Sequence, residues 1–203
     1  MLDVDVLTTD TPHWSQISTA QVMLSSLIPA NAAHNSLLGL IGLTRKPIHM
    51  IEVDAIVFPI DQYFFTIHST GLKSFLRHIG IEFQNTLCAS EPLQHGDVRL
   101  IPVQHAKCKA LILACRIYPH NDTLFSCYQK SLCLAVDHEF TTIAFNLLGT
   151  NPFPFKRHTS TNIAAKAVAD FIVSNPHTLR NKLIFFGTST QDLEQMGLYF
   201  EQF

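Results

Sequence analysis

The chain has 203 residues and a formal net charge of −2, and 47% of its residues are hydrophobic whereas 15% are charged. This length and composition predict one folded domain with a large buried core and exclude a disordered chain. The near-zero net charge gives no electrostatic footprint for non-specific DNA binding. One small basic cluster, Lys156-Arg157-His158, is the local exception.

The start of the chain does not resemble a signal peptide, because "MLDVDVLTTD" has early acidic residues and no basic residue. The longest apolar region, Val22–Leu43, is interrupted by proline, asparagine, histidine and glycine and is too broken to cross a bilayer as one helix. The five cysteines include no C-x-x-C pair, which favours free thiols over disulfides or a zinc site. We therefore expect an intracellular protein, cytoplasmic or nuclear, with no metal site.

Apolar runs and amphipathic stretches alternate along the chain and predict its strands and helices. The first half contains two predicted strands, Leu37–Leu43 and Val53–Phe58, and one predicted helix, Leu72–Ile79. The second half contains predicted strands Val98–Val103, Lys109–Tyr118, Thr141–Phe145 and Lys182–Gly187, and predicted helices Thr123–His138, Thr161–Ser174 and one from about Gln191. Residues 1–35 are expected to form an N-terminal extension that packs on a domain of residues 36–203.

Two of the predicted helices carry a clear apolar face. The first has Asn121-Asp122-Thr123 as cap candidates, and its core stripe contains Leu124, Cys127, Tyr128, Ser131 and Ala135. The second is expected to bury Ile163, Ala164, Ala167, Val168 and Phe171. Among the cysteines, Cys115 is predicted to be buried packing, while Cys127 and Cys133 should point to different faces of their helix.

Strands that alternate with helices imply crossover connections, which join parallel strands. The fold class is therefore α/β: a three-layer α/β/α fold with a central mixed, mostly parallel sheet and helices on both faces. Such sheets bind ligands in the loops that follow the carboxyl ends of the strands. Three loops qualify: Pro59–Gly71, Leu147–Ser160 and Thr188–Gln191.

The loop Leu147–Ser160 has the chemistry of a diphosphate site. Gly149 lets a ligand approach the backbone closely, and the following helix offers unpaired N–H groups at its positive end. Phe153 and Phe155 could cover a ribose or a base. The alternative is a proline-stiffened connection between strand and helix that buries the two aromatic side chains.

Several stretches resemble, in order, the motifs of the macro domain family. The longest is "YQKSLCLAVDHEFTTIAFNLLGTNPFPFKRHTSTNIAAKAVADF", and the others are "EVDAIVFPID", "HSTGLKSFLRHIG", "GDVRLIPV" and the tail "LIFFGTSTQDLEQMGLYFEQF". The tail is most similar to that of histone-variant macro domains. The resemblance covers roughly residues 37–203 and implies a macro-like fold with an ADP-ribose-type pocket.

The chain departs from the family pattern at positions that matter for chemistry. The family's catalytic asparagine pair aligns with Phe58 and Asp61, and its glycine-rich first loop aligns with Ser69-Thr70-Gly71. Two further loop glycines align with Asn151 and Pro154, whose side chains would crowd a diphosphate. The resemblance therefore implies a divergent macro domain whose hydrolase residues are largely lost.

The function that this resemblance implies is binding of ADP-ribose, a related nucleotide or an ADP-ribosylated protein, without a cofactor and without a membrane. The ligand-binding residues it assigns are Gly71, Gly149, Thr150, Asn151, Phe153 and Phe155. One alternative is an active mono-ADP-ribosyl hydrolase in which Asp61 and His68 take new catalytic roles. Taken without the family, those two residues also fit a solvated loop. A further alternative is a scaffold with a closed pocket that binds protein or nucleic acid.

Overall fold

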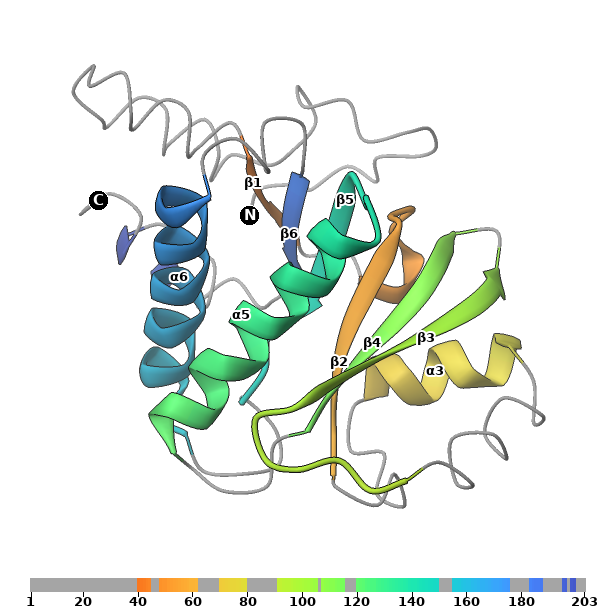
Figure 1. Cartoon of the computed structure of the whole chain (residues 1–203), viewed down its shortest axis with the longest axis horizontal. Helices are drawn as coiled ribbons and strands as arrows, with labels where there is room; N and C mark the ends of the chain where they lie inside the picture. The colour runs from red at the N-terminus through yellow and green to blue at the C-terminus, as the bar shows by residue number, and fades with distance from the viewer. Residues whose placement is uncertain are drawn as a thin grey trace, which may run out of the picture.

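The computed structural model describes residues 40–44, 48–61, 70–79, 91–105, 107–115, 120–149, 155–175, 183–187, 195–196 and 198–199. Their elements follow in the order β1 (Ile41–Thr44), η2 (Ile48–Met50), β2 (Ala55–Ile60), α3 (Thr70–Ile79), β3 (Val98–His105), β4 (Cys108–Cys115), α5 (Asn121–Asp137), β5 (Thr142–Asn146), α6 (Arg157–Ser174) and β6 (Leu183–Gly187) (Figure 1). The helix expected from Gln191 is represented by helical residues 195–196 and 198–199. The expected N-terminal extension, residues 1–35, lies outside the described residues.

The described strands form one six-stranded sheet in the order β1-β6-β5-β2-β4-β3. All neighbouring pairs are parallel except β3 and β4, which are antiparallel. The edge strand β3 contains Pro102, which is exposed and lies beside a shift of register, as expected for a residue that has no amide to donate. The predicted mixed, mostly parallel sheet is confirmed.

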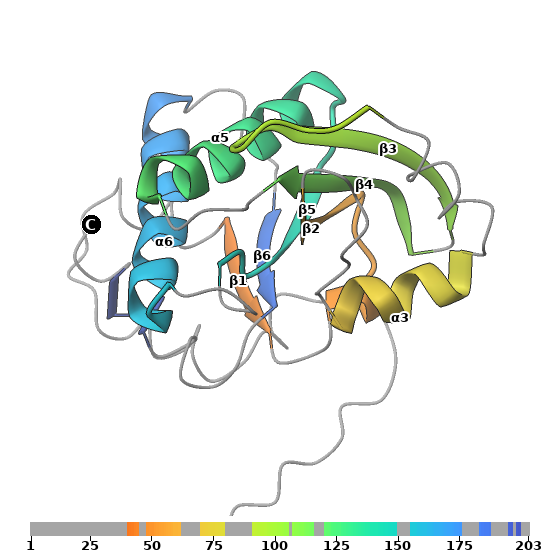
Figure 2. The same cartoon turned by 90° about the horizontal axis from the view of Figure 1, so that it is seen from below.

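Helices cover both faces of the sheet, as the three-layer prediction requires. Figure 2 shows α5 and α6 on one side of the sheet and α3 on the other. Each side has its own apolar cluster: α5 and α6 pack with Val57, Ile112 and Phe145, whereas α3 and η2 pack with Ile56, Phe58 and Leu111. The alternation along β2 from one cluster to the other explains why its sequence is a continuous apolar run.

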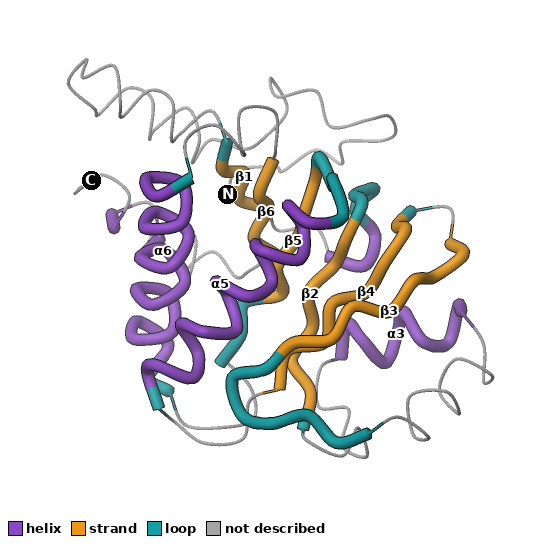
Figure 3. Tube along the Cα trace, in the orientation of Figure 1, coloured by secondary structure: helices purple, strands orange, loops and turns teal. Residues whose placement is uncertain are grey.

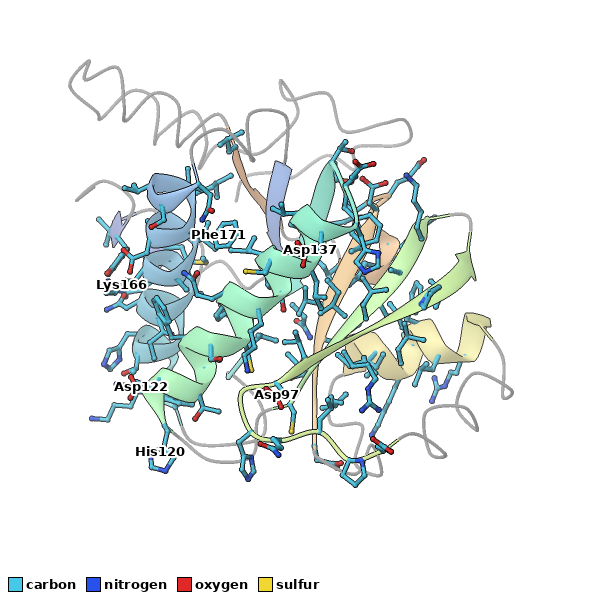
Figure 4. All side chains as sticks on the ribbon, viewed as in Figure 1. Asp97, His120, Asp122, Asp137, Lys166 and Phe171 are labelled. Carbon is cyan, nitrogen blue, oxygen red and sulfur yellow. The ribbon has the colours of Figure 1, made fainter. Side chains whose placement is uncertain are left out.

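The predicted apolar faces of α5 and α6 are confirmed. Buried α5 residues are Leu124, Cys127, Tyr128, Ser131, Leu132 and Ala135, and α6 buries Ala164, Ala167, Val168 and Phe171 with Ile163 partly buried. Figure 4 shows Phe171 pointing from α6 toward the interior and Lys166 on the opposite side of the helix. Cys115 is buried as predicted, and Cys127 is buried whereas Cys133 is exposed.

Two predicted helix starts are wrong. Helix α5 already includes Asn121, and its cap residue is His120, which makes no side-chain cap hydrogen bond. Helix α6 begins at Arg157 instead of Thr161, because the amides of Thr159 and Ser160 donate to the Lys156 carbonyl at 2.9 and 3.2 Å. The hydroxyl residues Thr159, Ser160 and Thr161 therefore lie inside the helix and do not precede it.

A buried carboxylate, Asp54, fastens the amino-terminal ends of three neighbouring strands. Its Oδ2 accepts hydrogen bonds from the amides of Thr141 and Thr142 at 2.7 and 3.0 Å, and Lys109 Nζ lies 2.6 Å from its Oδ1. Burial by itself would raise the pKa of Asp54, but the hydrogen bonds from Lys109, Thr141 and Thr142 outweigh it and hold that pKa well below its usual range. This cluster lies at the end of the sheet opposite the candidate site.

A second fastening joins the start of β3 to β4 and α5. Gly96 adopts a φ of 80°, donates its amide to the Cys115 carbonyl at 2.9 Å and accepts from Ser126 Oγ at 3.1 Å. Lys130 on α5 forms an ion pair with Asp97. Figure 3 shows the described loop that leads into β3 passing close to the end of β4. These contacts hold the start of β3 against the carboxyl end of β4, which is itself the parallel neighbour of β2.

Candidate ligand site at the carboxyl ends of β2 and β5

The sheet brings two of the predicted site residues to one edge. Strands β2 and β5 are parallel neighbours, and Val57 pairs with Phe145. Asp61 follows the end of β2 and Gly149 follows the end of β5, each four residues beyond that pair (61 − 57 and 149 − 145). The two loops that leave these strands therefore start side by side, at the edge where open α/β sheets bind ligands.

Asp61 is half-buried and lies beside the end of β4, since Ile60 pairs with Cys115. The pKa of the Cys115 thiol is raised to about 12, mainly by burial and to a smaller extent by the negative charges of Asp61 and Asp97. Cys115 Sγ also lies 3.5 Å from the Leu93 carbonyl, to which it donates. The thiol is therefore protonated at neutral pH, which removes Cys115 as a nucleophile and leaves Asp61 as the reactive group at this strand end.

Gly149 is buried and has a φ of 93°, a conformation that disfavours any residue with a Cβ. The preceding residue, Leu148, is held on both of its backbone polar groups. Its amide donates to the Tyr128 hydroxyl at 2.9 Å, and its carbonyl accepts a hydrogen bond from the Ser160 hydroxyl. The Tyr128 ring in turn packs against Phe145, with 5.1 Å between ring centroids. The start of the loop is thus fixed by α5 and α6 together.

The sequence alone did not assign Tyr128 or Ser160 to the site. The sequence places Tyr128 on the core stripe of its helix, where a buried tyrosine needs a hydrogen-bond partner, and this need is the signal from which a further contact could have been inferred. Ser160 carried no comparable signal, because its contact joins a helix residue to a loop 12 positions earlier.

Helix α6 begins directly after the loop and presents its positive end there. The amides of Arg157 and His158 belong to its first turn, whose N–H groups have no partner within a helix, and the cap residue Lys156 makes no side-chain cap hydrogen bond. Lys156 and His158 are exposed. The basic cluster seen in the sequence is therefore located at a helix terminus that already favours anions.

The other predicted ligand residues are distributed as follows. Phe155 packs on the core beside α5 and α6 and stays partly exposed, which fits the buried-aromatic alternative for this side chain without removing all of its surface from a ligand. Gly71 lies in the first turn of α3. His68, Thr150, Asn151 and Phe153 lie outside the described residues. Their roles in binding or catalysis stay predictions.

Phe58, which the sequence resemblance predicts to stand in place of a catalytic asparagine of the family, is a core residue. Its side chain is fully buried and packs against Phe75 of α3, with 6.3 Å between ring centroids. A phenyl ring in this position offers no hydrogen-bond donor or acceptor.

Within the described parts of the chain, no helix is both long and apolar enough to cross a membrane. Those same parts of the chain contain no group of three or more histidine, cysteine or acidic side chains that could bind a metal ion.

The arrangement defines a class: a three-layer α/β domain whose candidate site lies at the carboxyl ends of parallel strands, beside a helix N-terminus. Residues 70–164 match the sequence model of the macro domain family. The chain is similar to the macrodomain of Trypanosoma brucei, whose crystal structure contains ADP-ribose, with a TM-score of 0.73 and 18% identity over 85% of this chain and 72% of that one. These findings show that the chain has the macro domain fold and that residues 70–164 carry the sequence pattern of that family.

Two curated relatives support the same family over a shorter stretch. The chain is 34% identical over 56 residues to an ADP-ribose glycohydrolase (MACROD2) of Xenopus laevis, which is 28% of this chain and 13% of that protein. It is 38% identical over 55 residues to a macro domain-containing protein of Methanosarcina mazei, which is 27% of this chain and 29% of that protein. The match therefore spans less than a third of each relative. The resemblance of the tail to histone-variant macro domains stays a prediction.

Proposed function

We propose that this macro domain binds ADP-ribose, free or attached to a protein, at the carboxyl ends of β2 and β5. The main observation behind the proposal is the fixed start of the loop after β5. There Gly149 has a left-handed backbone, and the loop leads to the N-terminus of α6. A glycine in this conformation followed by a helix terminus is suited to a phosphate group. The macrodomain of Trypanosoma brucei, which has the same fold, holds ADP-ribose in its crystal structure.

Each predicted ligand residue has a role in this proposal. Gly149, Thr150, Asn151, Phe153 and Phe155 surround the phosphates and the distal ribose. Gly71, in the first turn of α3, lies near the diphosphate. Asp61 accepts hydrogen bonds from ribose hydroxyls, because an ionised carboxylate is an acceptor on both oxygens. Binding needs no cofactor and no membrane.

We further propose that this domain recognises ADP-ribose without hydrolysing its linkage efficiently. Phe58 is fully buried against α3, at the position that aligns with a catalytic asparagine of the family. A buried phenyl ring cannot hold a water or a ribose by a hydrogen bond. The residue that could still assist a reaction is Asp61, which is half-buried at the next strand end.

A hydrolase is the second candidate, and two observations favour it. The relative from Xenopus laevis is an ADP-ribose glycohydrolase, and Asp61 supplies a carboxylate at the edge of the candidate site. In that case Asp61 and His68 would act as acid and base. A scaffold that binds protein or nucleic acid is the remaining alternative, favoured by the burial of Gly149.

Calorimetric titration of the chain with ADP-ribose tests the binding function. Saturable binding with one ligand per chain is expected, and it should be lost in Gly149→Ala. If the wild type shows no heat of binding at millimolar ADP-ribose while it is folded, the nucleotide function is wrong and the scaffold alternative gains support.

Incubation with a mono-ADP-ribosylated protein separates binding from hydrolysis. The binding proposal expects no release of ADP-ribose above the spontaneous rate. Release that disappears in Asp61→Asn would establish the hydrolase instead, whereas release that persists in this variant would assign the activity to another residue.

A further inference from the structure

The backbone of Leu148 is clamped by hydroxyl groups from two different helices. The Tyr128 hydroxyl on α5 accepts a hydrogen bond from the Leu148 amide at 2.9 Å, and the Ser160 hydroxyl on α6 donates one to the Leu148 carbonyl. All three residues are fully buried. Without the hydroxyls, the amide and the carbonyl of Leu148 would be buried without partners, which costs about 1–3 kcal/mol for each group. The two hydroxyls, together called the clamp, therefore satisfy the backbone polar groups that the loop buries where it begins.

The clamp also sets the direction of the next amide. The carbonyl of Leu148 and the N–H of Gly149 belong to one planar trans peptide group, so they point in opposite directions. Because Ser160 holds the carbonyl, it fixes the Gly149 N–H within the same peptide plane in the direction opposite to the Ser160 hydroxyl. Tyr128 fixes the preceding peptide in the same way, through the Leu148 N–H.

The two helices that supply the hydroxyls are themselves joined near the clamp. Gln129, adjacent to Tyr128, donates from Nε2 to the carbonyl of Ala167 on α6 at 2.6 Å. The Tyr128 ring also rests on Phe145 of β5. Contacts between α5, α6 and the sheet therefore help to set the hydroxyl positions, in addition to the contacts with the loop.

We propose that Tyr128 and Ser160 are positioning residues that preset the Gly149 amide for the phosphate of ADP-ribose. The inference rests on the proposed function and adds the two residues that the family resemblance did not assign. Neither residue touches the ligand; they act by holding the backbone in its binding geometry before the ligand arrives, which removes an ordering cost from binding.

The test uses single-hydroxyl deletions and a matched control. The variants are Ser160→Ala and Tyr128→Phe. The control is Ser131→Ala, because Ser131 is also fully buried but donates at 2.7 Å to Cys127 within its own helix. Ser160→Thr keeps a hydroxyl and serves as the conservative rescue.

Calorimetry with ADP-ribose should show affinity about tenfold weaker in Ser160→Ala and in Tyr128→Phe, the size of effect that loss of one hydrogen bond produces. Ser131→Ala and Ser160→Thr should bind within about twofold of wild type, even where their melting temperatures fall. If Ser160→Ala is folded and binds ADP-ribose no more weakly than Ser131→Ala, the positioning role is wrong.

A measurement without ligand separates this inference from the proposed function. Amide hydrogen exchange followed by NMR should be faster at Leu148 and Gly149 in both deletion variants, and unchanged at those amides in Ser131→Ala. Faster local exchange in a chain that does not bind ADP-ribose would support the clamp and overturn the nucleotide function. Unchanged local exchange in both deletion variants would overturn the clamp, whatever the wild type binds.

Discussion

At the scale of single residues, the candidate site depends on backbone geometry more than on reactive side chains. Gly149 provides a left-handed φ, and Leu148 provides two polar groups that are held by buried hydroxyls. Asp61 is the described ionisable side chain that the sheet places beside them. The residue-scale predictions therefore concern one glycine and the four described cysteines.

Replacing Gly149 by alanine is expected to abolish ADP-ribose binding and to lower the free energy of unfolding by about 1–3 kcal/mol, the usual cost of a strained backbone. The matched control is Gly96→Ala, because Gly96 also has a positive φ, and its added Cβ would lie 3.3 Å from Thr123 Cγ2. Both variants should lose stability in urea denaturation, and calorimetry should show that Gly96→Ala still binds. If Gly149→Ala binds as wild type does, the ligand does not use this loop.

Alkylation should follow exposure among the four described cysteines. Burial raises the pKa of both Cys108 and Cys115 to about 12, and Cys133 is the exposed member of the set. Burial and Asp137 also raise the pKa of Cys133, so its reaction at pH 8 should be slow. Mass spectrometry after iodoacetamide treatment should find Cys133 modified before Cys108, Cys115 or Cys127. Early modification of Cys115 would contradict its place in the core.

At the scale of elements, the strands and helices were predictable because their signals are local. The apolar run Ile143–Phe145 is typical of a strand that is buried on both faces, and the stripe on α5 has the period of a helix. The start of α6 was missed because its cap residue, Lys156, makes no side-chain hydrogen bond that a sequence pattern could announce. The clamp on Leu148 was missed because it joins residues from two helices and a loop, and such a contact exists only after the helices pack.

The fastening of the strand starts by Asp54 is an element-scale feature with a measurable energy. Asp54→Asn should lower the free energy of unfolding by about 1–3 kcal/mol, because it weakens the hydrogen bonds from two backbone amides. Lys109→Met should cost less than about 1 kcal/mol, because the Lys109 side chain is 75% exposed. Equal losses in the two variants would show that the ion pair matters more than the amides.

The same carboxylate predicts a dependence of stability on pH. The pKa of Asp54 is lower in the folded chain than in the unfolded chain. Its stabilising effect is therefore complete above the unfolded value, about 3.9, and is lost as the pH falls through the depressed folded value. Urea denaturation of the wild type and of Asp54→Asn should differ by a constant amount from pH 5 to pH 7 and by less as the pH falls below about 4. A difference that grows in acid would reverse the assigned direction.

At the scale of the whole molecule, the fold and the function are supported by different kinds of observation. The order and direction of the strands, the helices on both faces and the likeness to solved macrodomains all bear on the fold. The family's nucleotide function depends on loops of which the structure describes the first residues, Leu147 to Gly149 on one side and Asp61 on the other. A measurement on the intact chain is therefore the most direct way to connect the two.

Ligand binding to the folded chain must raise its thermal stability by mass action. At a free ADP-ribose concentration of about one hundred times the Kd, the stabilisation is about 2.7 kcal/mol, and each kcal/mol moves the Tm of a domain of this size by about 2–4 °C. We expect ADP-ribose to raise the Tm of the wild type and of Gly96→Ala, and to leave that of Gly149→Ala unchanged. A single-stranded RNA at the same concentration should have no effect, since the net charge is −2. A rise with RNA and none with ADP-ribose would replace the nucleotide function by the scaffold alternative, with the fold assignment intact.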